Sequence, residues 1–236
     1  MYTVERIDPS KTAMIVVDMQ NDFVAAGAPL ESAAGRAMVP NLQQALACCR
    51  EEGIPVIYTA HVHRADGCDL GLLGHAQQIA RRDALVAGSA GAAIFSEIAP
   101  RDDEIVISKH RFSAFYGTDL EIILRGLGVT TVVITGVTTE NCCHATARDA
   151  FFRDFQVVFL SDATATGDYP DLGYGSLSAD EVHRTTLVIL ARDTADVITT
   201  ETFIDRVVTV PDTKPGQAVD PLVGITQSAR EVALVP

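Results

Sequence analysis

The sequence has no long apolar run and no cluster of positive charge. Its apolar stretches cover only a few residues at a time, which is too short for a helix that spans a membrane. Lys and Arg number 18 against 31 Asp and Glu, and the resulting net charge of −13 is spread along the chain. A charge balance of this kind disfavours binding to nucleic acid or to an anionic membrane surface. We therefore expect neither as a partner.

The sequence also lacks the cysteine pattern of a secreted protein. Its five cysteines are an odd number, and four of them form the adjacent pairs Cys48-Cys49 and Cys142-Cys143, unlike a disulfide framework. The first residues, MYTVERIDPSK, bring charge before any apolar run, which is not the pattern of a signal peptide. We expect a cytoplasmic protein with reduced thiols.

Internal repeats and a second core are absent from the pattern as well. A chain of 236 residues with 47% hydrophobic content is long enough for one large domain, which we expect over residues 1–236. Residues 209–236 show no clear periodicity and are expected to form a C-terminal arm or tail.

Strand-like and helix-like segments alternate along the chain. The strand-like segments are residues 13–17, 54–59, 104–108, 132–134, 156–160 and 196–199. Helical spacing or capping boxes mark residues 39–49, 118–127, 141–152, 178–191 and 201–208. This alternation predicts a Rossmann-like three-layer α/β/α fold with a six-stranded, mainly parallel sheet. Residues 60–103 and 163–175 are expected to be loops near the site.

Three reactive side chains follow directly after predicted strands. Asp18 follows the first strand, Lys109 the third, and Cys142 lies in the turn after the fourth. Ligands bind at the carboxyl ends of the strands in such sheets, so these three side chains should meet. Lys109 and the helix N-terminus would favour a thiolate, and Asp18 could move the proton, which together make a nucleophilic site. The alternative is that the cysteine pair consists of two small buried hydrophobes.

Three motifs surround these side chains. They are VVDMQNDF at residues 16–23, SKHRFSAF at residues 108–115, and GVTT at residues 136–139 leading to Cys142 and ATARDA at residues 145–150. In this order the motifs resemble the isochorismatase-like cysteine hydrolase family over roughly residues 10–205. That family includes nicotinamidases, N-carbamoylsarcosine amidase, ureidoacrylate amidohydrolase and biuret hydrolase.

The resemblance implies roles for particular residues. It puts Asp18, Lys109 and Cys142 in a catalytic triad, and the spacing from the motif glycine selects Cys142 over Cys143. It also implies a cis peptide bond at Val137-Thr138 and an oxyanion hole made of the backbone N–H groups of Thr138 and Cys142.

One departure from the family concerns a metal. Nicotinamidases carry an Asp-x-His pair and a later His that hold a metal, whereas the corresponding residues here are Ala60-His61-Val62-His63. Because the family's metal Asp is missing, we expect no metal and no other cofactor. The alternative is a metal cluster of His61, His63 and His75, since imidazole suits Zn and Fe.

The expected substrate is a small molecule with both N–H and C=O groups. Its pocket is predicted to be lined by Phe23, His61, Arg111, Phe112, Tyr116 and Glu140. A loop that carries Tyr169 and Tyr174 is a candidate lid. Glu140 accepts hydrogen bonds and Arg111 donates them, which favours ureides and carbamoyl compounds.

These observations predict a cysteine-dependent amidohydrolase that cleaves a C–N bond through a thioester-type intermediate. The alternatives are an isochorismatase proper, which hydrolyses a vinyl ether, a nicotinamidase-type amidase, and a non-catalytic thiol sensor. We also expect a homo-oligomer, either a dimer or a tetramer.

Overall fold

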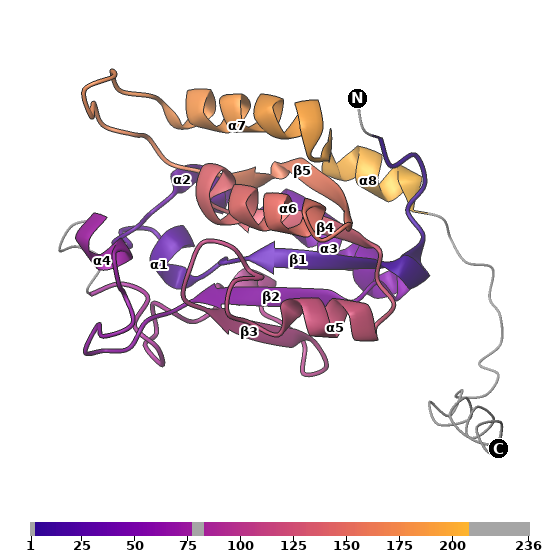
Figure 1. The fold of residues 1–236 in the computed structure, drawn as a ribbon, viewed down its shortest axis with the longest axis horizontal. Coiled ribbons are helices and arrows are strands. Elements are labelled where there is room, and N and C mark those ends of the chain that lie inside the picture. The colour runs from indigo at the N-terminus through magenta and orange to yellow at the C-terminus, as the bar shows by residue number, and fades with distance from the viewer. Residues whose placement is uncertain (1–2, 77–82, 208–236) are drawn as a thin grey trace, which may run out of the picture.

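A six-stranded sheet forms the centre of the protein in the computed structural model, which describes residues 3–76 and 83–207 (Figure 1). The strands are β1 (Thr12–Val17), β2 (Val56–His61), β3 (Ile105–Lys109), β4 (Thr131–Val137), β5 (Gln156–Ala165) and β6 (Asp196–Ile198). Their order is β3-β2-β1-β4-β5-β6, and every neighbouring pair is parallel. The predicted six-stranded, mainly parallel sheet is therefore confirmed.

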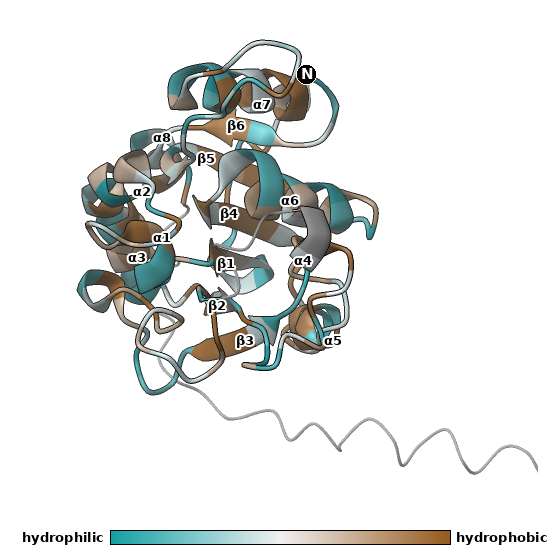
Figure 2. Cartoon of the chain, turned by 90° about the vertical axis from the view of Figure 1, so that its left-hand side faces the viewer, coloured by the Kyte–Doolittle hydropathy of each residue, from teal (hydrophilic) through white to brown (hydrophobic). Residues whose placement is uncertain are grey.

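Helices cover both faces of the sheet (Figure 2). They are α1 (Asn21–Val24), α2 (Ala33–Ala37), α3 (Val39–Glu52), α4 (Leu73–Ala76), α5 (Leu120–Gly126), α6 (His144–Phe151), α7 (Ala179–Asp193) and α8 (Thr200–Arg206). The described residues also form three further helical turns, η1 (Pro9–Lys11), η3 (Ser96–Ile98) and η4 (Thr139–Cys143). Helices α3 and α8 lie on one side of the sheet, and α5 and α6 lie on the other (Figure 2). The expected three layers are present.

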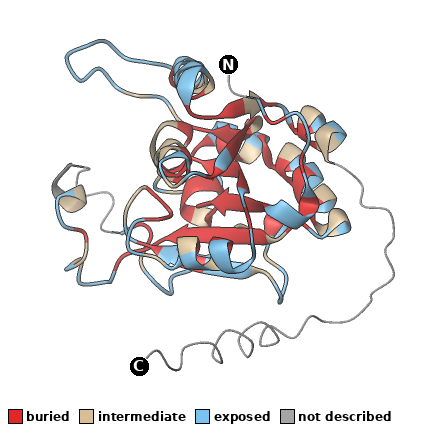
Figure 3. Cartoon of the chain, turned by 45° about the vertical axis from the view of Figure 1, so that its right-hand side comes forward, coloured by how far each residue is buried: buried red, intermediate tan, exposed pale blue. Residues whose placement is uncertain are grey.

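Strand β1 shows why the sheet must have two covered faces. All six of its residues are buried, and successive side chains in a strand point to opposite faces. Met14 and Val16 join the core that contains α3, whereas Ile15 and Val17 join the core that contains α5 and α6. Burying an aliphatic side chain of this size contributes about 1.5–3 kcal/mol. Buried residues accordingly fill the middle of the molecule (Figure 3).

The strand register brings chemically reactive residues to one edge of the sheet. Val17 of β1 pairs with Thr59 of β2 and with Gly136 of β4. His61 of β2 pairs with Lys109 of β3. Since the strands are parallel, their carboxyl ends and the residues that follow them lie side by side. The site is built at this edge.

The two predicted capping boxes have different outcomes. At α7, Ser178 Oγ accepts a hydrogen bond from the N–H of Glu181 (3.3 Å), and Glu181 Oε2 accepts one from the N–H of Ser178 (2.9 Å), so this box is confirmed. The predicted box at residues 118–121 is wrong. Helix α5 begins at Leu120, and its N-cap residue Asp119 makes no side-chain cap. The hydroxyl of Thr118 instead donates to the carbonyl of Ala114 (2.5 Å), which holds the preceding turn.

Other boundaries also differ from the prediction. Strand β2 continues to His61, and β5 continues to Ala165, so the first residues of the predicted 163–175 loop are strand. The β4–β5 pairing contains a register shift between Ile134 and Gly136, which accommodates the longer strand. The predicted C-terminal tail, residues 209–236, lies outside the described residues.

Within residues 3–76 and 83–207, no helix combines the length and the apolar character needed to cross a membrane.

Candidate active site

Asp18, Lys109 and Cys142 meet at the carboxyl edge of the sheet, as the sequence predicts. Lys109 Nζ lies 2.7 Å from Asp18 Oδ2 and 3.3 Å from Cys142 Sγ. The Asp18 and Lys109 side chains are fully buried, and Cys142 is 3% exposed. An acid, an ammonium and a thiol are therefore in direct contact in a site from which bulk water is excluded.

The backbone conformation of Asp18 and the hydroxyl of Thr59 orient the Asp18 carboxylate. Its φ angle is +50°, an uncommon conformation for a residue other than glycine, at the point where β1 ends. Thr59 Oγ1 donates to Asp18 Oδ1 (2.7 Å) and also accepts from the N–H of Asp18 (3.2 Å). Thr59 was not among the predicted site residues. Its position opposite Val17 in the β1–β2 register explains the contact.

Lys109 is held by three acceptors. Besides Asp18 and Cys142, its ammonium donates to the carbonyl of Arg111 (2.9 Å). Burial alone would lower the pKa of Lys109, but the neighbouring Asp18 and Cys142 outweigh burial and raise that pKa above its ordinary value. The raised pKa favours the charged form of Lys109, which places a positive charge beside Asp18 and Cys142.

Cys142 differs from the sequence-based expectation of a thiolate. Burial raises the pKa of Cys142 to about 12, and the positive charge of Lys109 offsets this only in part. The nearby Asp18 raises the pKa further, through its charge and a hydrogen bond with the thiol. The resting group is a thiol at neutral pH, so attack requires a base, and Asp18 is in place to act as one.

The turn that carries the Cys142 thiol has an unusual backbone conformation. The peptide bond between Val137 and Thr138 is cis, as the resemblance implied. Cys142 lies in the π-helical turn η4 rather than in the first turn of α6, where it was expected. The neighbouring Cys143 is fully buried, and its Sγ contacts the carbonyl oxygen of Thr135 at 3.7 Å. Only Cys142 of the pair contacts Lys109.

Glu140 stands two residues before Cys142. Its Oε1 accepts hydrogen bonds from Thr138 Oγ1 (2.9 Å), Asn141 Nδ2 (2.8 Å) and Tyr169 OH (2.8 Å). Its Oε2 is buried, and none of the described residues donates to it. The predicted lid residue Tyr169 therefore belongs to a network around Glu140, whereas Tyr174 is fully exposed.

His61 and Phe112 lie together near the thiol. The two rings pack edge to face with centroids 6.4 Å apart. A ring nitrogen of His61, a carboxylate oxygen of Asp18 and Cys142 Sγ all lie within 4.8 Å of one another. Phe23, another predicted lining residue, is buried in the core on the α3 side of the sheet.

Arg111 and Tyr116 lie at a surface cavity of about 330 Å³ whose lining includes none of the three triad residues. Arg111 Nη1 donates to the carbonyls of Asp69 (3.0 Å) and His110 (2.6 Å). One arm of the guanidinium is thus committed to the protein's own main chain. A contact between Arg111 or Tyr116 and substrate stays a prediction.

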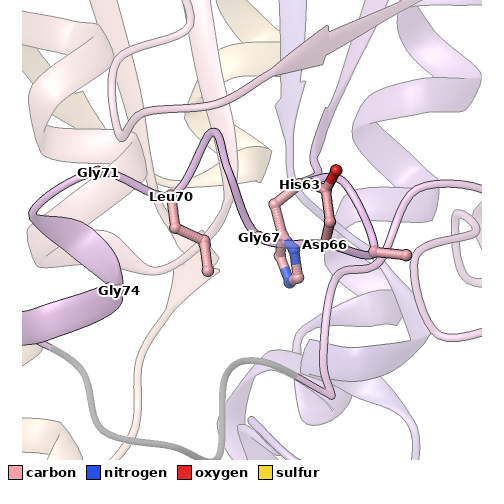
Figure 4. Close-up of a pocket in the computed structure, with 7 residues that line it drawn as sticks. His63, Asp66, Gly67, Leu70, Gly71 and Gly74 are labelled. Carbon is pink, nitrogen blue, oxygen red and sulfur yellow. The ribbon is translucent and has the colours of Figure 1, made fainter.

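A second cavity, of about 270 Å³, borders the loop that follows β2 (Figure 4). Its lining includes His63, Leu70 and Gly71, which approach it from one continuous stretch of chain. The His63 ring is within hydrogen-bond distance of two carbonyl oxygens, those of Arg64 (2.8 Å) and Ala84 (2.7 Å).

These contacts bear on the alternative metal cluster of His61, His63 and His75. Both ring nitrogens of His63 lie within hydrogen-bond distance of main-chain carbonyl oxygens, and the side chain of His75 lies outside the described residues. Within the part of the chain that the structure describes, the one group with metal-ligand spacing is Asp18, His61 and Cys142. In that group, Asp18 and Cys142 both contact the Lys109 ammonium, and this positive charge disfavours a metal cation at the same atoms.

The isochorismatase domain model matches residues 12–202, which is most of the chain and all of the sheet. This chain belongs to the isochorismatase family. Its fold is similar to the solved structure of a cysteine hydrolase from Pseudomonas syringae pv. phaseolicola 1448A. The two chains are 35% identical, with a TM-score of 0.82, and the match covers 85% of this chain and 93% of that one.

Two curated relatives of this isochorismatase-family chain are enzymes that act on amides. Nicotinamidase 3 of Arabidopsis thaliana is 33% identical over 80% of this chain and 86% of its own. The ureidoacrylate amidohydrolase of Methylobacterium radiotolerans is 34% identical over 67% of this chain and 68% of its own. The predicted resemblance to this family is thereby confirmed. The names of the two relatives give different substrates.

Proposed function

We propose that this chain is a cysteine-dependent amidohydrolase that cleaves a C–N bond of a small amide, ureide or carbamoyl compound. The observation that carries this proposal is the buried contact of Lys109 with both Asp18 and Cys142. A thiol nucleophile, a base that also serves as an acid, and a fixed positive charge are the groups that acyl transfer needs. The two amide-hydrolysing relatives support the same reaction type.

In the first half-reaction, Cys142 Sγ attacks the substrate carbonyl carbon while the thiol proton passes to Asp18. The oxyanion is held by the backbone N–H groups of Thr138 and Cys142, which we propose as the oxyanion hole. Asp18 then gives the proton to the departing nitrogen, and the C–N bond breaks. The acyl or carbamoyl group is left on sulfur, and water releases it in the second half-reaction.

Ureides and carbamoyl compounds are the proposed substrate class because of Glu140. Its Oε1 is held by three donors, and its buried Oε2 accepts from none of the described residues. A buried carboxylate oxygen without a donor is costly, and a substrate N–H would remove that cost. A planar molecule with several N–H groups suits this arrangement better than an apolar amide.

The test is a side-by-side measurement of kcat/KM for biuret, ureidoacrylate and N-carbamoyl amino acids against nicotinamide and isochorismate. We expect the best ureide to exceed both others by at least tenfold, which corresponds to about 1.4 kcal/mol of transition-state preference. The Glu140→Gln variant should lose most of this preference, whereas the exposed Glu97→Gln should keep it. A tenfold preference for nicotinamide or isochorismate would reject the ureide assignment.

A further inference from the structure

The triad leaves one buried reactive side chain unused. His61 is the last residue of β2, pairs in register with Lys109, and is only 4% exposed. A ring nitrogen of His61 lies within 4.8 Å of both Cys142 Sγ and an oxygen of Asp18. Four reactive groups, rather than three, therefore converge at the edge of the sheet.

The position of His61 is fixed by its neighbours. Gln20 Nε2 donates to the carbonyl of His61 (2.9 Å), and Gln20 Oε1 accepts from its N–H (2.8 Å). Gln20 is fully buried and also donates to the carbonyl of Ala92 (2.9 Å). On the other side, the ring of Phe112 packs edge to face against the imidazole. These contacts keep the ring close to the sulfur.

The second half-reaction needs a base for water, and Asp18 is heavily engaged. Its Oδ1 accepts from Thr59 Oγ1 (2.7 Å), and its Oδ2 is 2.7 Å from Lys109 Nζ. One oxygen has a hydrogen-bond donor and the other is held in an ion pair, which leaves Asp18 little capacity to bind and orient a water molecule as well. An imidazole is the commonest general base in enzymes.

We propose that His61 is the general base that activates water for release of the acyl group from Cys142. This role rests on the function proposed above, and it gives the two half-reactions different bases. The distance between the His61 ring and Cys142 Sγ suits this role. The attacking water would lie about 3 Å from the acyl carbon and about 3 Å from the base. A base in that position lies a few ångströms from the sulfur that carries the acyl group.

The proton and electron changes balance. A water lone pair forms the new C–O bond while a water proton moves to the His61 nitrogen. The tetrahedral intermediate then collapses, its C–S bond breaks, and the sulfur leaves with the bonding electrons. The imidazolium returns its proton to sulfur, so the products are the acid, a neutral imidazole and a neutral thiol. Burial of the sulfur favours this return, since it disfavours a thiolate.

The experiment uses 4-nitrophenyl acetate, an acyl donor whose leaving group needs no proton. Release of 4-nitrophenolate reports acylation of Cys142, and intact-protein mass spectrometry reports the acetyl adduct. We expect His61→Gln to keep a burst of one nitrophenolate per active site and then to turn over about 10²-fold more slowly, with the adduct accumulating. Hydroxylamine, which needs no base, should discharge the adduct at similar rates in the variant and the wild type.

Control variants separate this role from a structural one. His110→Gln changes a half-exposed imidazole outside the proposed machinery and should behave as the wild type. His61→Asn is the second substitution, and the melting temperature of each variant shows whether it folds. Loss of the burst in folded His61→Gln and His61→Asn, or deacylation at the wild-type rate in either, would overturn the role of His61. A wild-type protein that forms no adduct on Cys142 would instead reject the proposed function itself.

Discussion

At the scale of single residues, the contact with Lys109 distinguishes two adjacent cysteines. It contacts Cys142 Sγ at 3.3 Å, whereas Cys143 Sγ faces the carbonyl of Thr135. The same two residues looked equivalent as a buried pair in the sequence, and only the family spacing separated them. The contact with Lys109 supplies a physical reason for the choice.

Replacement of each cysteine by serine should therefore have opposite effects on activity. We expect Cys142→Ser to lower kcat by roughly 10⁴-fold or more, because a serine hydroxyl is a far weaker nucleophile in this site. Cys143→Ser should keep most of its activity, since its new hydroxyl can still donate to the carbonyl of Thr135. Steady-state kinetics on the best amide or ureide substrate measures both, and equal losses would contradict the assignment of the nucleophile.

The raised pKa of Cys142 predicts an unusual pH dependence for alkylation. Below a pKa of about 12, the thiolate fraction grows about tenfold with each pH unit. Modification of Cys142 by iodoacetamide should thus accelerate from pH 7 to pH 10 without reaching a plateau. Lys109→Met should slow it further, because Lys109 lowers the pKa. Peptide-resolved mass spectrometry separates Cys142 from the exposed Cys68, and a plateau near neutral pH would show that the resting group is a thiolate.

At the scale of elements, the end of β4 is built around a glycine. Gly136 has a φ angle of +107°, a conformation that residues with a Cβ atom rarely adopt. A Cβ at this position would lie 2.0 Å from the carbonyl oxygen of Val17 in β1. The close approach of β4 to β1 just before Asp18 and Val137 thus depends on the missing side chain.

Gly136→Ala should be strongly destabilising. We expect a loss of at least about 2 kcal/mol in the free energy of unfolding, because neither backbone can move without breaking the β1–β4 pairing. Gly126→Ala is the matched control: Gly126 ends α5 and is exposed, and an added Cβ would meet no atom within 4 Å beyond its own helix backbone and chain neighbours. Urea denaturation measures both variants, and similar stabilities would show that β1 and β4 tolerate a side chain at this point.

At the scale of the whole molecule, large apolar side chains are exposed on the arm between β5 and α7 and on α7 itself. They are Leu172, Tyr174, Leu177, Val188 and Ile189. This arm extends away from the sheet at the end of the molecule opposite α5 (Figure 1). Exposed apolar groups gathered in this way are typical of interaction surfaces.

We expect these groups to contribute to self-association into a dimer or tetramer. Replacement of both Leu172 and Tyr174 by serine should shift the protein to a smaller species, because it removes apolar surface from the contact. Ile122→Ser, in α5, removes a side chain that is 76% exposed and should leave the assembly unchanged. Sedimentation velocity measures the species present, and a wild-type monomer at micromolar concentration would contradict the expectation.

The sheet and its strand-end residues could be predicted because they depend on local pattern. Short apolar segments separated by helical spacing specify a parallel sheet, and Asp18 and Lys109 directly follow two of those segments. The parallel arrangement alone then brings their side chains to one edge. The motifs around Cys142 completed the triad by resemblance.

The protonation state of the thiol and the place of His61 depended on the tertiary structure. The sequence shows that a lysine and a helix N-terminus accompany Cys142, but not that the surrounding core excludes water and raises the pKa of the thiol. Likewise, β2 was expected to end at residue 59, and its pairing with β3 carries it to His61, next to the sulfur. Local sequence determines which groups are available at the edge of the sheet. Burial and strand register, which arise only when distant segments pack together, determine how those groups are charged and which of them meet.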